Sequence, residues 1–203
     1  LPEPGFVGMT LPLRPTVEQV RSSLELIELM SSGFEFASAD DKANGLAMHA
    51  AQFASQIDAA MIPLGVTSSP EKGSGKTYFC SGIPVIYGGS LHPGWPAREE
   101  EMVKVLGTFL SSTGGSSLVF DNVKGAIDSP SLEGMLTSDL ARMRRLGGHD
   151  SDKVGGIGKQ VLVTSNNASI SEDNLRRSLA VRLAPAMRSR RIASPGGRSA
   201  PVR

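Results

Sequence analysis

The chain is poor in cysteine and histidine and lacks long apolar stretches, and each scarcity excludes a class of protein. Its single cysteine, Cys80, rules out a disulfide within the chain and suits a reducing compartment. The three histidines lie far apart and share no ligand spacing with Cys80, so we expect no zinc site. No run of about twenty apolar residues is present, which argues against a membrane-spanning helix. Without a basic segment leading into an apolar one at the start, we expect no secretion and a cytoplasmic location.

Size and composition fit one ordinary globular domain. The chain has 203 residues, of which 39% are hydrophobic and 20% charged, enough to bury a substantial core. A start at Leu1 rather than at methionine is compatible with a fragment or a trimmed chain.

Acidic residues are missing from the end of the chain. The net charge is only +1, but Asp173 is the last acid, and eight arginines follow it. Such a basic end favours contact with phosphate or nucleic acid, and a solvated tail is the alternative. For residues 185–203, rich in Arg, Ser, Pro and Gly, we expect disorder. The arginines are Arg176, Arg177, Arg182, Arg188, Arg190, Arg191, Arg198 and Arg203.

Two helices are predicted near the start, after a proline-rich arm. Thr16 and Gln19 form a capping-box pattern, and a second helix should start near Ser38 with Asp41 as its partner. Each helix carries an apolar stripe that we expect to pack against a core. The stripes are Val17, Val20, Leu24 and Ile27 in the first helix, and Leu46, Ala50, Phe53 and Ile57 in the second.

Strands and helices then alternate, which predicts an α/β fold of the P-loop NTPase type, with helices flanking a largely parallel sheet. After Lys76 we expect a short or bent helix, because Gly82 and Pro84 interrupt it. Strands are expected at 62–66, 117–120, 160–164 and 179–183, helices from Glu99 and from Ser129, a loop at 87–96 and a glycine-rich excursion at 147–158.

The stretch Ser68–Thr77, with the sequence SSPEKGSGKT, predicts a phosphate-binding loop between a buried strand and a helix. Gly73 and Gly75 can adopt backbone angles that turn N–H groups toward phosphate oxygens. The start of the following helix adds unpaired N–H groups and the positive end of its dipole. We therefore expect residues 73–77 to bind the phosphates of a nucleotide.

Two side chains at the end of this loop are expected to complete the site. Lys76 should contact the β- and γ-phosphates of ATP, and the Thr77 hydroxyl should bind Mg²⁺, with Ser74 between the two glycines. The full pattern has glycine where this chain has Pro70, so a surface turn containing a lysine is the alternative interpretation.

Asp121 follows three apolar residues, Leu118–Phe120, as a carboxylate at the end of a buried strand would. Beside a phosphate loop, such an acid can hold Mg²⁺ through water. Asn122 comes next, where many ATPases have a catalytic glutamate. An amide orients water but accepts no proton, so the base must be weak or lie elsewhere.

Two further pairs of residues are candidates for catalytic roles. Asn166 and Asn167 end the third strand and could contact the γ-phosphate or the attacking water, although asparagines are also common in plain turns. Arg176 and Arg177 follow, and one of them could reach a neighbouring subunit's nucleotide. The alternative for the arginines is a surface ion pair with Asp173 or Glu172.

Taken together, these segments resemble the ATPase domain of phage- and plasmid-encoded primase-helicases, a branch of the AAA+ P-loop ATPases. The resemblance covers roughly residues 34–184, and similar proteins carry Asp-Asn and Thr-Gly-Asn-Asn at the second and third motifs. It rests on Phe34–Phe36, Asp40–Asn44, Pro63–Leu64, Pro70, Gly73–Thr77, Glu100, Lys104, Val119–Val123, Asp128–Ser129, Leu132, Leu136–Thr137, Arg144, Leu146–Gly147, Thr164–Asn167 and Arg176–Arg177.

The resemblance implies an ATP- and Mg²⁺-dependent motor that acts on single-stranded DNA in the replication of a mobile element. It also implies a homo-oligomeric, hexameric ring, a partner primase and an arginine finger at Arg176 or Arg177. It divides the chain into an arm and helix at 1–33, the ATPase domain at 34–184 and a basic tail at 185–203. Two alternatives stay open: a degenerate nucleotide-binding module without turnover, favoured by Gly82 and Pro84, and a DNA-binding protein that uses its basic end.

Overall fold

The computed structural model describes residues 14–57, 60–113, 115–138, 140–144 and 151–185. Its centre is a five-stranded sheet in the order β2-β3-β7-β1-β9, with every pairing parallel. These strands are β1 (Leu64–Ser68), β2 (Gly89–Pro93), β3 (Ser117–Val123), β7 (Gln160–Ser165) and β9 (Ser178–Arg182). The predicted α/β fold with a largely parallel sheet is confirmed, and it is consistent with a P-loop NTPase fold.

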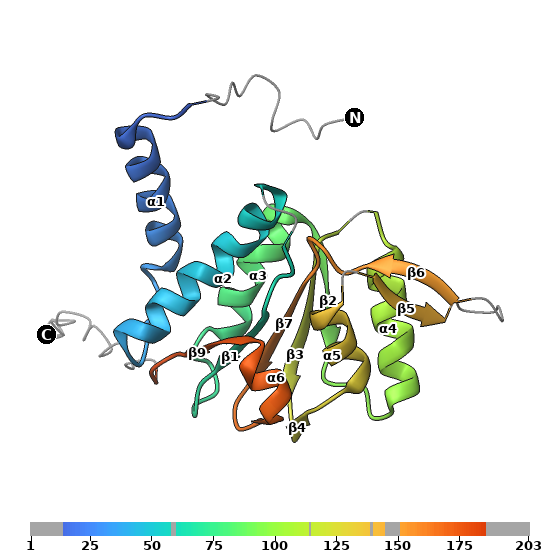
Figure 1. The fold of residues 1–203 in the computed structure, drawn as a ribbon. Helices are drawn as coiled ribbons and strands as arrows, with labels where there is room; N and C mark the ends of the chain where they lie inside the picture. Colours follow the sequence, from blue (N-terminus) through green and yellow to red (C-terminus); the bar gives the residue numbers. More distant parts are fainter. Residues whose placement is uncertain (1–13, 58–59, 114, 139, 145–150, 186–203) are drawn as a thin grey trace, which may run out of the picture.

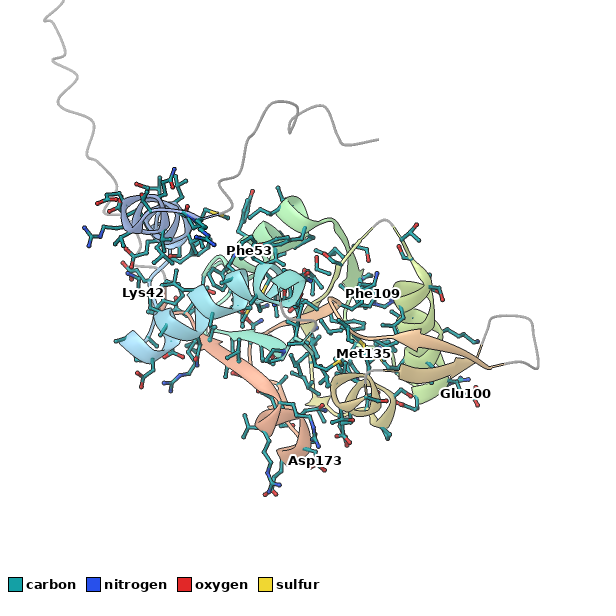
Figure 2. All side chains as sticks on the ribbon, turned by 45° about the horizontal axis from the view of Figure 1, so that its top comes forward. Lys42, Phe53, Glu100, Phe109, Met135 and Asp173 are labelled. Atoms are coloured by element: carbon teal, nitrogen blue, oxygen red, sulfur yellow. The ribbon has the colours of Figure 1, made fainter. Side chains whose placement is uncertain are left out.

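Helices cover both faces of this sheet (Figure 1). One face carries α2 (Ala39–Ile57) and α3 (Lys76–Tyr87), and the other carries α4 (Glu99–Ser111) and α5 (Pro130–Thr137). Alternating residues of β3 show the division, because Val119 packs toward α3 while Leu118 and Phe120 pack with α4 and α5. Figure 2 shows Phe109 and Met135 directed into the second of these layers. Burial on both faces explains the apolar runs of the strands.

The remaining elements lie around the sheet. The α1 helix (Val17–Ser31) stands away from the body, and α6 (Glu172–Arg176) precedes β9 (Figure 1). The short strands β4 (Ala126–Ile127) and β8 (Ser169–Ile170) pair with each other, and β5 (Leu140–Arg144) forms a hairpin with β6 (Ser151–Gly155). No helix among the described residues is both long and apolar enough to cross a bilayer.

The predicted helix starts are confirmed, but the predicted packing of their apolar stripes is wrong. Thr16 and Gln19 form the capping box of α1, and Ser38 exchanges hydrogen bonds with Asp41 at the start of α2. Val17 and Leu24 of α1, however, are 72% and 57% exposed. In α2 the predicted stripe lies on a different face of the helix from the buried residues. The buried face consists of Asp41, Gly45, Met48, Gln52 and Ser55.

Three expectations about the middle of the chain need correction. The predicted loop at 87–96 contains β2, and the glycine-rich excursion at 147–158 contains β6. The α3 helix is not cut short at Gly82 or Pro84, since it continues to Tyr87 over 12 residues. Gly82 allows close packing, because a Cβ there would lie 3.0 Å from the His49 ring of α2. Residues 186–203, expected to be disordered, lie outside the described residues.

Candidate nucleotide site

The predicted phosphate loop joins the end of β1 to the start of α3, as its sequence indicates. Gly73 and Gly75 have φ of 78° and 86°, a region that favours glycine. Gly75 is also confined by packing, because a Cβ there would lie 3.0 Å from the ring of Phe34. It is the N-cap of α3 and offers no side chain to the first amides of the helix. The loop therefore leads into a helix N-terminus without a side-chain cap, which is the arrangement that binds phosphate in P-loop proteins.

Lys76 is folded back across this loop. Its side chain is nearly buried, with 9% of the residue exposed. The ammonium donates hydrogen bonds to the carbonyl oxygen of Glu71 at 2.9 Å and to Oγ of Ser74 at 3.0 Å. Burial lowers the pKa of Lys76, and the nearby negative charge of Asp121 opposes that shift. The loop thus holds a partly desolvated cation between two neutral oxygens.

Thr77 and Asp121, which lie 44 residues apart in the sequence, meet in one site. The Thr77 hydroxyl donates to Oδ1 of Asp121 at 2.7 Å, and the Thr164 hydroxyl donates to the same oxygen at 2.7 Å. Parallel strands bring the three together, because the carboxyl ends of β1, β7 and β3 lie at one edge of the sheet. The carboxylate is therefore held directly beside the first turn of α3.

Asn122 lies in a bulge that follows the carboxylate. Its φ is 56°, unusual for a residue other than glycine, and the register of β3 with β7 shifts between Phe120 and Val123. The backbone N–H of Asn122 donates to Oγ1 of Thr164 at 2.8 Å, which fixes the bulge. Its exposed side chain lines a cavity of about 390 Å³ together with Trp95 and Lys124.

Asn166 and Asn167 lie beside the beginning of the phosphate loop. They line a cavity of about 430 Å³ that also includes Ser69 and Pro70. The Oδ1 atom of Asn166 is buried and accepts no hydrogen bond among the described residues. An orphaned buried acceptor is costly, which makes this amide a candidate for contact with a ligand or water.

Arg176 and Arg177 do not join this site. The Arg177 carbonyl accepts from the N–H of Leu64, the first residue of β1, whereas the phosphate loop follows the last residue of that strand. Both arginines therefore lie at the opposite end of β1 from their own phosphate loop. Arg177 donates to the Asp173 carbonyl at 2.7 Å and pairs with the Asp173 carboxylate at 3.7 Å. Figure 2 shows Asp173 at the rim of the molecule.

Two residues near the site are not predicted from the sequence to have a role in it. Thr164 links Asp121 to the bulge, but only the pairing of β7 with β3 brings it there. Arg182 ends β9 beside the last residue of β1 and lines the cavity that contains Asn166. Its guanidinium pairs with the buried carboxylate of Asp41 at 3.2 Å. The pKa of Asp41 is lowered, because hydrogen bonds from Ser38 and Arg182 outweigh the opposing effect of burial.

Comparisons with known proteins leave the family open. No family model matches the chain, and no curated protein matches it. Among solved structures, the C-terminal region of NrS-1 overlaps with a TM-score of 0.45 at 10% identity, over 92% of this chain and 42% of that one. The JCV helicase, solved with a bound acetamide compound, overlaps with a TM-score of 0.44 at 17% identity, over 84% and 52%. The chain thus spans about half the length of these structures. At such scores the likeness does not define the fold, which follows from the strand order and the phosphate loop.

Proposed function

We propose that this chain binds ATP with Mg²⁺, hydrolyses it, and acts as a motor domain on single-stranded DNA in the replication of a mobile element. One observation carries the first part of the proposal. The Thr77 hydroxyl and the Asp121 carboxylate lie 2.7 Å apart at the mouth of a loop whose lysine is already held inside. Residues from two distant segments meet in the way that a nucleotide with its metal requires.

The donor set fits Mg²⁺ bound to a nucleotide. Thr77 and Asp121 offer hard oxygen ligands, the type that Mg²⁺ prefers. Among the described residues no group of three or more His, Cys, Asp or Glu side chains could hold an ion alone. Phosphate oxygens and water would therefore supply the other ligands, as is usual for this ion. When bound, Mg²⁺ would neutralise the charge of the phosphates.

The protein's own groups would then divide the work. Lys76 would exchange the neutral oxygens of Glu71 and Ser74 for phosphate oxygens, a charge-assisted bond that is roughly twice as strong as a neutral one. The buried Oδ1 of Asn166, which has no partner among the described residues, would accept a hydrogen bond from the attacking water. Alternatively, the amide nitrogen of Asn166 would donate to the γ-phosphate. Asn122 and Asn167 remain candidates for the same task.

The DNA part of the proposal is supported by the distribution of basic residues. The β5–β6 hairpin projects from the body on the side of α4 (Figure 1), and its strands contain Arg142, Arg144 and Lys153. Its register pairs Arg142 with Lys153. A sequence rich in Lys and Arg favours contact with the phosphates of nucleic acid. A ring and a primase partner are further parts of the proposal.

An arginine finger from a neighbouring subunit is compatible with the position of Arg176 and Arg177. Because they lie at the far end of β1 from their own loop, any nucleotide they contact would belong to another copy of the chain, and the surface ion pair of Arg177 with Asp173 is the alternative role. A finger in trans contributes about 10³–10⁵ to the rate of well-studied nucleotide hydrolases. Arg176→Ala and Arg177→Ala should leave ATP affinity nearly intact and cripple turnover. Adding a Lys76→Ala chain, which still offers its arginines, should restore part of the activity, and normal hydrolysis by both arginine variants would refute the finger.

The experiment that tests the site compares Asp121→Asn with Asp128→Asn. Asp128 is exposed and lies on the same segment, so it is a matched control. Affinity for a fluorescent ATP analogue and phosphate release would be measured on the same samples, across a Mg²⁺ titration and with and without single-stranded DNA. We expect Asp121→Asn to keep most of its nucleotide affinity and lose Mg²⁺-dependent turnover, while Asp128→Asn behaves like wild type. Normal turnover by Asp121→Asn would refute the site, and binding without turnover in the wild type would indicate a non-hydrolysing module.

A further inference from the structure

The two edge strands of the central sheet, β9 and β2, differ in how far their outward backbone groups are hydrogen-bonded among the described residues. At the β9 edge, helix α2 and the chain before it occupy the outward backbone groups. The amide of Asn44 donates to the carbonyl of Ala180 at 2.9 Å, and the Asp41 carboxylate accepts from the N–H of Arg182 at 2.8 Å. The N–H of Ala37 donates to the Arg182 carbonyl at 2.9 Å. Capping of this kind protects an edge from pairing with another chain.

The β2 edge is covered only at its start, where Gly115 lies against Gly89, because a Cβ on Gly115 would be 3.0 Å from the Cα of Gly89. Gly88 accepts from the N–H of Ser117, and Gly94 donates to the carbonyl of Asp121, so both face β3. Because the backbone alternates along a strand, Gly89 and Leu91 between them turn their N–H and C=O groups outward. Within the described residues these outward groups have no hydrogen-bond partner. Leu91 is 53% exposed.

A groove runs along the same strand. It has a volume of about 580 Å³, within the range of about 300–1,000 Å³ typical of ligand sites. Strand β2 forms one wall with Leu91 and His92, and helix α4 forms the other with Phe109 and Lys104. Figure 2 shows Phe109 pointing inward from α4. The groove is therefore an apolar trough bounded on one side by free backbone groups.

Lys104 gives the groove a positive charge. It is the only acidic or basic side chain in the lining, apart from the imidazole of His92. It makes no ion pair with any described residue. A partner that fills the groove would place a carboxylate beside this ammonium to avoid burying an unpaired charge.

We propose that the groove between β2 and α4 binds an extended peptide segment of a partner protein, which adds to β2 as a sixth strand. Its backbone would pair with the outward groups of Leu91. One of its apolar side chains would enter the trough toward Phe109, and an acidic side chain would pair with Lys104. Strand addition takes its affinity from main-chain hydrogen bonds and its selectivity from pockets for alternate side chains.

This surface is distinct from the phosphate loop, although the last residue of β2, Pro93, lies beside Asp121. In the sheet order two strands, β3 and β7, lie between β2 and β1, and the phosphate loop follows β1. The proposal therefore does not depend on ATP binding. Peptide binding and nucleotide binding can be measured on one sample, so the failure of one leaves the other intact.

The test uses a random heptapeptide library displayed on phage, selected against the full chain. Leu91→Pro removes the outward N–H of Leu91, whereas Leu91→Thr alters the side chain but keeps that N–H and is the matched control. Lys104→Glu reverses the charge, with Lys104→Gln as the neutral comparison. Circular dichroism and thermal unfolding would confirm that each variant folds. Should Leu91→Pro fail to fold, the Lys104 pair and amide exchange at Leu91 in the wild type still decide.

We expect enriched peptides to combine β-branched apolar residues with an acid. Their affinity should fall about tenfold in Leu91→Pro and in Lys104→Glu, and stay within about twofold in Leu91→Thr. Hydrogen exchange at the Leu91 amide should slow when the peptide binds. The proposal is overturned if selection yields no peptides, if the enriched peptides bind Leu91→Pro as well as wild type, or if the Leu91 amide stays unprotected.

Discussion

Replacement of Thr164 by valine removes the hydroxyl that joins the carboxylate of Asp121 to the bulge at Asn122. Thr164 is 1% exposed, and its hydroxyl accepts from the Asn122 N–H at 2.8 Å and donates to Asp121 at 2.7 Å. Valine has nearly the same shape, so the change deletes two hydrogen bonds and creates little void. An unpaired buried donor costs about 1–3 kcal/mol, and a hydrogen bond to a charged group contributes about 1.5–3 kcal/mol.

Asp121 keeps the hydrogen bond from Thr77, which limits the loss. We therefore expect the free energy of unfolding to fall by about 2–3 kcal/mol, which lowers Tm by roughly 5–10 °C in a domain of this size. Thr67→Val on β1 is the matched control. Thr67 is also fully buried, but among the described residues its hydroxyl accepts only from the weak thiol of Cys80, at 3.2 Å.

The assay is urea unfolding of both variants, followed by circular dichroism. Thr67→Val should lose less than about 1 kcal/mol, because a weak S–H donor gives up little. Equal losses in the two variants would show that the Thr164 hydroxyl does not hold the carboxylate. The account of the site's geometry would then be wrong.

Three further predictions concern residues that belong to α3 or pack against it. Burial lowers the pKa of His49 from its ordinary 6.5, so the unfolded chain binds more protons than the folded one just below that pH. The free energy of unfolding should fall as pH drops through 6.5, and His49→Gln should flatten this dependence in urea titrations; a flat wild-type curve would contradict it. Burial raises the pKa of Cys80 to about 12, so a thiol reagent at pH 8 should label the chain only after unfolding, and fast native labelling would contradict the burial. Pro84→Leu should raise stability by about 1–3 kcal/mol in calorimetry, because α3 runs on past this residue, and a lower Tm would show that its end requires proline.

The parts of the site that the sequence predicts are those carried by contiguous residues. Gly73, Gly75, Lys76 and Thr77 lie in one loop whose glycines indicate its backbone, and Asp121 follows a short apolar run that is typical of a buried strand. Their meeting follows from the general rule that parallel strands bring their carboxyl ends to one edge. Thr164 and Arg182 could not be found in this way, since their roles depend on which strands are neighbours.

The elements that the sequence misses are those stabilised by distant partners. Strand β2 begins at Gly89 and ends at Pro93, two residue types with low strand propensity. Hydrogen bonds to β3 stabilise the strand in spite of this low propensity. The error in α2 has a related cause. Its buried face includes Asp41 and Gln52, whose polar groups bond to Arg182 and to the Ser116 carbonyl, so burial there does not follow hydrophobicity.

For α1, the sequence predicts the helix but not whether its apolar stripe is buried. Periodicity correctly predicts the helix and its caps, because these depend on residues three and four apart. Whether a partner covers the stripe depends on where the helix lies, and α1 stands away from the sheet (Figure 1).

ATP affinity of Lys76→Ala compared with Lys72→Ala tests the central claim most directly. Both lysines belong to the same loop, but Lys72 is exposed whereas Lys76 is held against Glu71 and Ser74. Titration of each variant with a fluorescent ATP analogue in Mg²⁺ should show tight binding by wild type and Lys72→Ala, and its loss in Lys76→Ala. Unchanged affinity in Lys76→Ala, or equal losses in both variants, would mean that this loop does not bind the phosphates of ATP.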